Sequence, residues 1–374
     1  MDLANQINPA VQSLTDRLRA RIEQEGPIPF YEWMKAALYD QREGYYCRRD
    51  RIRQGRAGDY RTAPETSPLF AAVFANYFMK SYFDLQTPRE WTIIEVGGGA
   101  GDFAHGVLST LQRRFPQVFA ATRYVIDEIS DSARSQIQTK VAEFKERVQF
   151  QSLSEITEPF PYAIVFANEL LDAFPVHRVI GRGGMLRELF VGLNEPGGFA
   201  WTENDLTAEV GGYSERVQLQ LAEGQIYEVN LDAERFVSDA AKLIGEGLLI
   251  TIDYGAPRAE LINDPARFTG TLRTFHRHQV GDNVLSHPGA QDLTTTVDWT
   301  QVIEVGQANG LETIRLEPLD KFLSTQGAFE ELSAATDEIR DSAEFFNFVA
   351  AARELILPNS LGGAFQVLVQ RKVA

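Results

Sequence analysis

Cysteine and histidine are scarce in this sequence: there is one cysteine, Cys47, and there are five histidines among 374 residues. A single cysteine excludes an internal disulfide and a multi-cysteine metal site. His276, His278 and His287 lie in one segment, but their spacing matches no established metal-binding template. We therefore expect no metal site, and we expect a structural or hydrogen-bonding role for His278. Long apolar runs are also missing, so no segment approaches the roughly 20 residues of a membrane span.

Positive charge is also in short supply. The chain has 36 Lys and Arg against 52 Asp and Glu, which gives a net charge of −16. Because such a chain repels phosphate on average, we expect no nucleic-acid partner, and we interpret the arginines of residues 48–56 as a solvated loop or a small-anion site. An acidic protein attracts cationic partners instead. The first residues lack the basic and apolar regions of a secretory signal, so we expect a cytoplasmic location.

Short apolar segments alternate with helical patterns from Trp91 onward. This alternation predicts an α/β fold with a Rossmann-like parallel sheet covered by helices on both faces. We expect a helical N-terminal segment at 1–85 and a main domain at 86–374, the latter interrupted by an α+β insertion at 178–229 and a second inserted segment at 256–300. The predicted strands are 91–96, 124–126, 148–150, 162–167, 247–252 and 363–370. The predicted helices are 11–25, 30–38, 69–83, 103–115 and 130–144, with a long loop at 42–68.

A glycine-rich turn follows the first predicted strand, with glycines at Gly97, Gly98, Gly99 and Gly101. Glycine lets the backbone take positive φ and approach a ligand closely. A dinucleotide fingerprint needs a further glycine where Asp102 stands, so the spacing favours a smaller zwitterionic ligand and disfavours an NAD-dependent dehydrogenase. The turn alone is also compatible with a purely structural role.

Carboxylates stand at the ends of the first two predicted strands. Glu95 precedes the glycine turn, and a carboxylate there is costly to bury unless it is paired. S-adenosylmethionine offers an ammonium and a sulfonium to pair with it. After the second strand, Glu128 is suited to accept the ribose hydroxyls of such a cofactor. The alternative is that Asp127 to Asp131 only cap the following helix.

The fourth predicted strand is followed by the segment N-E-L-L-D-A-F-P-V-H, residues 168–177. An amide and two carboxylates at such a strand end are poorly explained by packing, although a capped helix start remains the structural alternative. The segment resembles the signature of the MidA-like methyltransferases, a family that includes a mitochondrial protein-arginine methyltransferase assisting assembly of respiratory complex I. Residues 26–30, 44–46, 58–67, 128–130, 252–255 and 292–298 resemble further motifs of that family in the same order.

The resemblance implies a class I methyltransferase sheet, S-adenosyl-L-methionine as cofactor and a protein substrate. In this interpretation Glu169 and Asp172 grip the acceptor, with His177 nearby, and Asn168 lines the methyl-transfer position and contacts the cofactor. The loop of residues 58–65 is expected to close over the site. The cofactor-binding residues would be Glu95, Gly97, Gly98, Gly99, Gly101, Glu128, Asn168, Gly58, Asp59, Thr62 and Glu65.

Two departures from the family pattern stand out. Gly98 replaces the usual proline of the turn, and Ala63 replaces a usual serine. The leading hypothesis is a protein-arginine methyltransferase acting on a partner such as a respiratory complex subunit. A methyltransferase for a small molecule or another acceptor, and a non-catalytic cofactor-binding assembly factor, are the alternatives.

Overall fold

The computed structural model describes residues 12–48, 66–276, 279–281, 283–339, 341–358 and 360–373, which form two compact units. Each unit is assembled from segments that are far apart in the sequence. The first unit comprises Met1–Arg51, Ala173–Asp232 and Pro257–Thr296, and the second comprises Ile52–Asp172, Ala233–Ala256 and Val297–Ala374.

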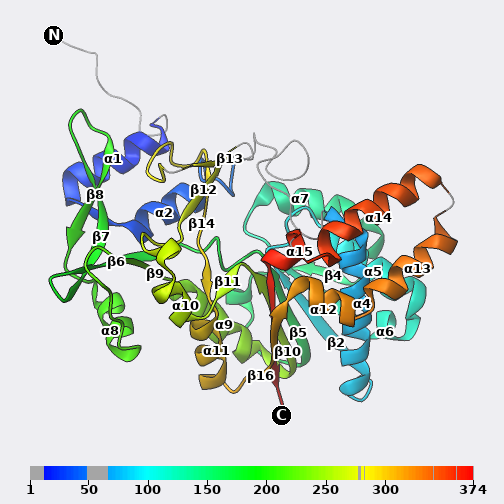
Figure 1. The fold of residues 1–374 in the computed structure, drawn as a ribbon. Helices are drawn as coiled ribbons and strands as arrows, with labels where there is room; N and C mark the ends of the chain where they lie inside the picture. Colours follow the sequence, from blue (N-terminus) through cyan, green and yellow to red (C-terminus); the bar gives the residue numbers. More distant parts are fainter. Residues whose placement is uncertain are drawn as a thin grey trace, which may run out of the picture. The chain divides into compact units, whose positions relative to one another are not determined.

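The second unit is built on a seven-stranded sheet with the order β16-β17-β10-β5-β2-β3-β4 (Figure 1). Five neighbouring strands, from β10 to β4, are parallel, and β17 runs antiparallel to both of its neighbours. The strand order reverses between β2 and β5, and open α/β sheets bind their ligands outside the carboxyl ends of the strands at such a point. The bounds are β2 Trp91–Val96, β3 Thr122–Asp127, β4 Val148–Phe150, β5 Phe160–Asn168, β10 Ile244–Asp253, β16 Glu312–Pro318 and β17 Gln366–Lys372.

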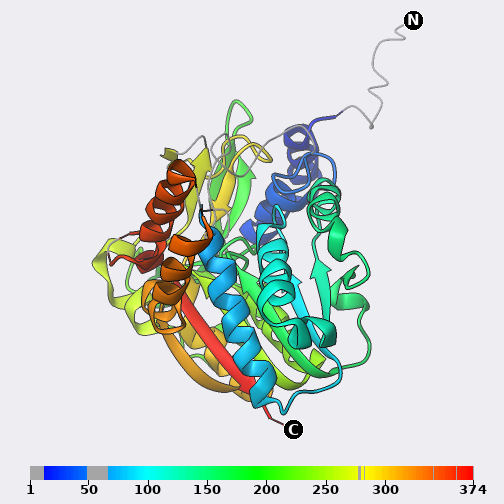
Figure 2. The same ribbon diagram turned by 90° about the vertical axis from the view of Figure 1, so that its right-hand side faces the viewer.

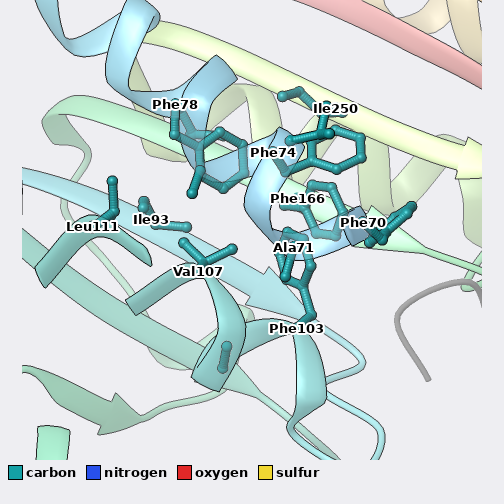
Figure 3. Packing of buried hydrophobic residues seen from close by; sticks show 14 of the residues in the cluster. Phe70, Ala71, Phe74, Phe78, Ile93, Phe103, Val107, Leu111, Phe166 and Ile250 are labelled. Atoms are coloured by element: carbon teal, nitrogen blue, oxygen red, sulfur yellow. The ribbon is translucent and has the colours of Figure 1, made fainter. Parts of the chain in front are cut away.

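One face of this sheet is covered by a phenylalanine-rich layer. Helix α4 (Pro68–Asp84) crosses the sheet beside α5 (Asp102–Arg114), as Figure 2 shows. Phe103 stacks on Phe166 of β5 with ring centroids 4.1 Å apart, and rings of α4 surround this pair (Figure 3). Since burying one such side chain stabilises the fold by about 1.5–3 kcal/mol, this layer is a main source of the unit's stability.

The other helices of the second unit follow or connect the strands. A short parallel bridge also joins β11 to β15. The bounds are α6 Pro116–Ala121, α7 Asp131–Lys140, α9 Leu231–Leu243, α11 Trp299–Ala308, α12 Leu319–Thr325, α13 Ala328–Glu338, α14 Ser342–Ile356, α15 Leu361–Ala364, β11 Gly255–Ala256 and β15 Val297–Asp298. The first two residues of α9 belong to the first unit.

The first unit contains an antiparallel sheet in which β1, β7, β6 and β9 are neighbours and β8 pairs with β7. Helix α2 packs on this sheet through buried aromatic residues, and Phe30 lies 4.9 Å from Trp201 between ring centroids. A smaller antiparallel sheet has the order β13-β12-β14. The bounds are α1 Leu14–Glu25, β1 Ile28–Pro29, α2 Phe30–Tyr39, β6 His177–Arg182, β7 Met185–Leu193, β8 Phe199–Asn204, α8 Ala208–Arg216, β9 Ile226–Val229, α10 Arg258–Asn263, β12 Arg273–His276, β13 Gln279–Gly281 and β14 Asp292–Thr294.

The predicted alternation of strands and helices is confirmed. The strands expected at 91–96 and 148–150 have those bounds, and those expected at 124–126, 162–167 and 247–252 are longer by a few residues at their ends. One expectation was wrong: Gly363 and Ala364 belong to helix α15 and the closing strand begins at Gln366. A short apolar run does not distinguish a buried helix end from a buried strand. The expected helix at 130–144 ends at Lys140 and continues as a 3₁₀ turn.

The observed units group the chain differently from the division expected at residue 85. Helix α4 belongs to the unit with the parallel sheet, while α1 and α2 belong with the hairpin strands β6 to β8. The physical reason is burial, since α4 carries apolar residues on most of its surface and packs on the sheet. No helix in the described part of the chain is long and apolar enough to cross a membrane.

Candidate functional site

The glycine turn connects β2 to α5 at the carboxyl edge of the sheet. Gly97, Gly99 and Gly101 have φ values of 75°, 55° and 81°, which side chains other than glycine rarely adopt. The Gly97 amide donates to the Asp127 carbonyl at 2.8 Å, and the Gly101 amide donates to the Gly98 carbonyl at 2.9 Å. The sequence prediction of a tight turn with an approachable backbone is therefore matched by its geometry.

Gly98 lacks a positive φ but is required for packing. A Cβ atom on Gly98 would lie 2.9 Å from Ile126 Cγ2 and 3.0 Å from Ile137 Cδ1. Real side chains almost never approach so closely, so any larger residue here must displace two buried isoleucines. This explains why glycine stands where the resembling family usually has proline: the side chains below the turn fill the space that a ring would need.

Glu95 lies at the end of β2, beneath the glycine turn, and only 4% of it is exposed. Tyr124 Oη donates a hydrogen bond to Glu95 Oε2 at 2.7 Å. Burial raises the pKa of Glu95 to about 8, opposed by the Tyr124 hydrogen bond and reinforced by the negative charges of Glu128 and Asp102. A carboxyl group in this state becomes ionised readily when a cation binds beside it.

Glu128 follows β3 and reaches back to the glycine turn. Its Oε2 accepts a hydrogen bond from the Gly99 amide at 3.2 Å, and its Oε1 accepts one from the Ser130 amide at 2.8 Å. The adjacent Asp127 is used elsewhere, because its Oδ2 accepts from the Leu153 amide at 2.9 Å. The helix cap of α7 is Ser130. Glu128 is thus held beside the turn, while capping falls to Ser130.

The turn after β5 lies next to the glycine turn. Val96 pairs with Ala167 in the ladder of β2 and β5, and a Cβ on Gly97 would lie 3.3 Å from Leu170 Cδ1. The glycine turn, which carried the cofactor prediction, and the turn that begins at Asn168, which carried the acceptor prediction, are therefore neighbours in the second unit.

Asn168 and Glu169 open this turn. Asn168 Nδ2 donates to Glu169 Oε1 at 3.0 Å, while Asn168 Oδ1 is buried without a hydrogen-bond partner in the described part of the chain. Glu169 has a φ of 51°, and its amide donates to the Ile252 carbonyl at 2.8 Å. A non-glycine residue in the left-handed region costs of order 1–3 kcal/mol, and such residues cluster at functional sites.

A carboxylate that we did not predict as a site residue holds the same turn. Asp253, at the end of β10, is fully buried, and its Oδ2 accepts from the Leu171 and Asp172 amides at 2.9 and 3.2 Å. Asp172 is itself 5% exposed. Burial, together with the charge of Asp172, raises the pKa of Asp253 well above its ordinary value. The sequence signal was the carboxylate at the end of the fifth predicted strand, the same position that singled out Glu95 and Glu128.

His177 belongs to the first unit, at the start of β6. Its Nδ1 lies 2.7 Å from Glu188 Oε1, and its ring stacks on Tyr31 with centroids 4.7 Å apart. Glu188 Oε2 accepts from the Thr207 amide at 2.7 Å. These contacts give His177 a defined place within that unit, and its expected catalytic role stays a prediction.

The loop residues Gly58, Asp59, Thr62 and Glu65, and the histidine at 278, lie outside the described residues. Within the described residues, Ser67 caps α4, with its Oγ accepting from the Leu69 amide at 3.3 Å. Among the described residues, no group of three or more His, Cys, Asp or Glu side chains is arranged to hold a metal ion.

The described residues fit a cofactor that combines a ribose with an ammonium and a sulfonium. Backbone approach at the glycine turn, the buried acid Glu95, the carboxylate of Glu128 and the unpartnered Asn168 Oδ1 together supply hydrogen-bond acceptors and negative charge. An acceptor-rich site of this kind is complementary to hydroxyl and ammonium donors.

Comparisons with known proteins point to the same chemistry. Residues 73–316 match the family model described as "Putative S-adenosyl-L-methionine-dependent methyltransferase". The chain is 26% identical to a mitochondrial protein arginine methyltransferase NDUFAF7 homologue of Drosophila melanogaster, covering 80% of this chain and 71% of that protein. It is 24% identical to human NDUFAF7, a mitochondrial protein arginine methyltransferase, over 96% and 83% of the two chains.

A solved structure extends this likeness to nearly the whole chain. A Burkholderia thailandensis protein, determined with bound S-adenosyl-homocysteine, superposes with a TM-score of 0.84 at 27% identity. The match covers 96% of this chain and 92% of that one. The expected class I methyltransferase fold is confirmed.

Proposed function

Because this chain belongs to the family of S-adenosyl-L-methionine-dependent methyltransferases, whose model spans residues 73–316, we propose that it methylates arginine side chains of a partner protein. The similar Drosophila and human proteins are named as protein arginine methyltransferases, which supports this acceptor. The net charge of −16 also favours a cationic substrate.

The residues of the glycine turn and its neighbours would hold the cofactor. Bound S-adenosylmethionine supplies an electrophilic methyl group on a sulfonium and leaves as S-adenosylhomocysteine. Glu128, which lies beside the glycine turn, would accept the ribose hydroxyl donors, and the buried Glu95 would pair with a positive group of the cofactor. Positive-φ glycines keep the backbone free of side chains where the cofactor would approach.

The turn after β5 would hold the acceptor. A guanidinium has a pKa of about 13.8, so it arrives charged and presents five N–H donors. Glu169 and Asp172 offer carboxylates on one short turn, and pairing with them orients one nitrogen toward the methyl group. As that nitrogen bonds to the methyl carbon, the carbon–sulfur bond breaks with its electron pair staying on sulfur. The nitrogen's proton passes to a carboxylate of the turn and from there to water.

The observation that carries the proposal is the adjacency of two turns. An acid-rich turn with an unpartnered amide oxygen lies beside a glycine turn suited to the cofactor, on neighbouring strands of one rigid sheet. Alignment of nucleophile and methyl group is the main contribution that an enzyme makes to such a displacement. A sheet that fixes both turns provides this alignment.

The hypothesis also concerns the partner protein and the location of the chain. We propose a partner protein such as a respiratory complex subunit, and a cytoplasmic location is the expectation from the sequence. A small-molecule acceptor is the alternative within catalysis, and a non-catalytic assembly factor that binds the cofactor is the alternative outside it.

The experiment is transfer of labelled methyl from S-adenosylmethionine to the proteins and metabolites of a cell extract. We expect the chain to label protein, and we expect Asp172→Ala to lower kcat/KM at least a hundredfold, because a misplaced acceptor loses most of its alignment. Asp239→Ala is the matched control, since that aspartate lies exposed on α9 of the same unit, where it forms a surface ion pair with Lys242 at 2.8 Å. Labelled metabolites without labelled protein, or an unchanged kcat/KM in Asp172→Ala, would contradict the proposal.

A further inference from the structure

We propose that Asp253 is a positioning residue for methyl transfer, because its carboxylate fixes the turn that carries Asn168, Glu169 and Asp172. The inference rests on the proposed function of that turn. It adds a residue that makes no contact with the acceptor and acts through the backbone that presents the acceptor-binding groups.

The geometry concentrates three backbone amides on one buried carboxylate. Asp253 Oδ2 accepts from Leu171 and Asp172, and Oδ1 accepts from the Tyr254 amide at 2.9 Å. The parallel ladder between β5 and β10 ends with Asn168 opposite Ile252. Asp253 therefore continues the connection between the two strands beyond the point where their backbones pair.

The turn needs such a support because its backbone is strained at Glu169. Glu169 stands at a φ of 51°, which persists only when surrounding contacts hold it. On one side the Glu169 amide is bonded to the Ile252 carbonyl at 2.8 Å, and on the other Asp253 Oδ2 accepts from the amides of Leu171 and Asp172. Removing the Asp253 anchor allows the turn to relax toward negative φ, which would move the carboxylate of Glu169.

A carboxylate serves this purpose better than an amide of the same size. Both of its oxygens can accept hydrogen bonds, in the ionised form without any donor and in the protonated form with acceptor capacity left on each oxygen, whereas an amide nitrogen only donates. In Asp253→Asn, the remaining oxygen can accept from Leu171 and Asp172 while the amide nitrogen faces the Tyr254 N–H. In the other orientation the oxygen accepts from Tyr254 and the amide nitrogen faces the N–H groups of Leu171 and Asp172. At least one backbone donor is left without a partner in a fully buried place, and each such donor costs about 1–3 kcal/mol.

The test compares the intact chain with its Asp253→Asn variant in three measurements. These are the maximal rate of label transfer to extract protein, the KM for S-adenosylmethionine, and the dissociation constant of S-adenosylhomocysteine by calorimetry. A positioning role predicts at least a tenfold lower maximal rate with the KM and dissociation constant within threefold of wild type. A crystal structure of the variant with S-adenosylhomocysteine is expected to show residue 169 displaced from positive φ.

Glu228→Gln is the matched control. Glu228 is another buried carboxylate that anchors a loop, accepting from the Thr271 amide at 2.8 Å, but it belongs to the first unit. It should lose stability while keeping the maximal rate within twofold. If Asp253→Asn does not fold, Asp253→Ser provides the same comparison with a smaller side chain.

The inference is overturned if the variant keeps its rate within twofold, if cofactor affinity falls as much as the rate, or if residue 169 keeps its φ. Failure of the proposed function looks different, because the wild-type chain itself would then label no protein. In that case the conformation of residue 169 in the variant still decides whether Asp253 holds the turn.

Discussion

Replacing Glu95 with glutamine should change how the stability of the protein depends on pH. Glutamine has the same shape and can still accept the Tyr124 hydrogen bond, so the substitution removes only the ionisable proton. Burial raises the pKa of Glu95 from its ordinary value of 4.5 to about 8 in the folded protein. The folded state therefore binds a proton here over a pH range in which the unfolded chain has released it.

The sign and size of the pH effect on stability follow from this difference between the folded and unfolded pKa of Glu95. The pKa of Glu95 is higher in the folded than in the unfolded protein, so its titration leaves the free energy of unfolding undiminished below pH 4.5. That free energy then falls as the pH rises through about 8. At 1.36 kcal/mol for each pKa unit, the interval between 4.5 and about 8 corresponds to a loss of about 5 kcal/mol. The free energy of unfolding of wild type should thus fall, relative to that of Glu95→Gln, by an amount of this order between these pH values.

The assay is denaturant unfolding of the cofactor-free protein at intervals from pH 5 to pH 9, with both proteins measured in the same buffers. Other titrating groups cancel in the difference between the two proteins. A difference that stays constant across this range would contradict the prediction, because Glu95 would then have the same pKa in the folded and the unfolded protein. A difference of the opposite sign would show that folding lowers the pKa of Glu95 and would contradict the effect of burial.

Cofactor binding extends the same experiment. We propose that the cofactor's positive groups lie near Glu95, so binding at pH 7 should expel the proton from its carboxyl group. Calorimetry in buffers of different ionisation heat should detect more proton release on S-adenosylhomocysteine binding to wild type than to Glu95→Gln. Equal proton release by the two proteins would remove Glu95 from the cofactor site.

Three further substitutions test separate parts of the structure. Glu128→Ala should weaken S-adenosylhomocysteine binding by at least tenfold, since hydrogen bonds to a charged group contribute about 1.5–3 kcal/mol; unchanged affinity by calorimetry would contradict its role. Gly98→Ala should lower the free energy of unfolding by about 1–3 kcal/mol through its clash with Ile126 and Ile137, and an unaltered denaturation midpoint would show that the isoleucines yield freely. Arg178→Ala should destabilise the protein by about 3 kcal/mol, because Glu228 would keep a buried charge without its ion-pair partner; a loss below 1 kcal/mol in denaturant unfolding would indicate that the Thr271 bonds suffice.

The features that the sequence predicts well are local. The apolar strands, the glycine turn and the carboxylates at strand ends all follow from neighbouring residues, and Gly97, Gly99 and Gly101 adopt the positive φ values that their spacing suggests. Strand β16 was not predicted because it lies at the sheet edge and none of its residues is buried, which gives it little apolar signal.

The features that the sequence does not predict depend on distant partners. Asp253 binds amides about 80 positions away in the chain, so its support of the turn appears only once β5 and β10 are neighbours. The reason for glycine at position 98 is equally non-local, since Ile126 and Ile137 come from β3 and α7. The stacking of His177 on Tyr31 joins residues from two segments of the first unit that are far apart in the sequence.

The central claim is that the methyl group goes to arginine in a protein. The most direct measurement is to label extract protein with the purified chain and methyl-labelled S-adenosylmethionine, hydrolyse the protein to amino acids and identify the labelled one. We expect methylated arginine, formed by wild type and strongly reduced with Asp172→Ala. Label on another amino acid, or only on a small molecule, would contradict it.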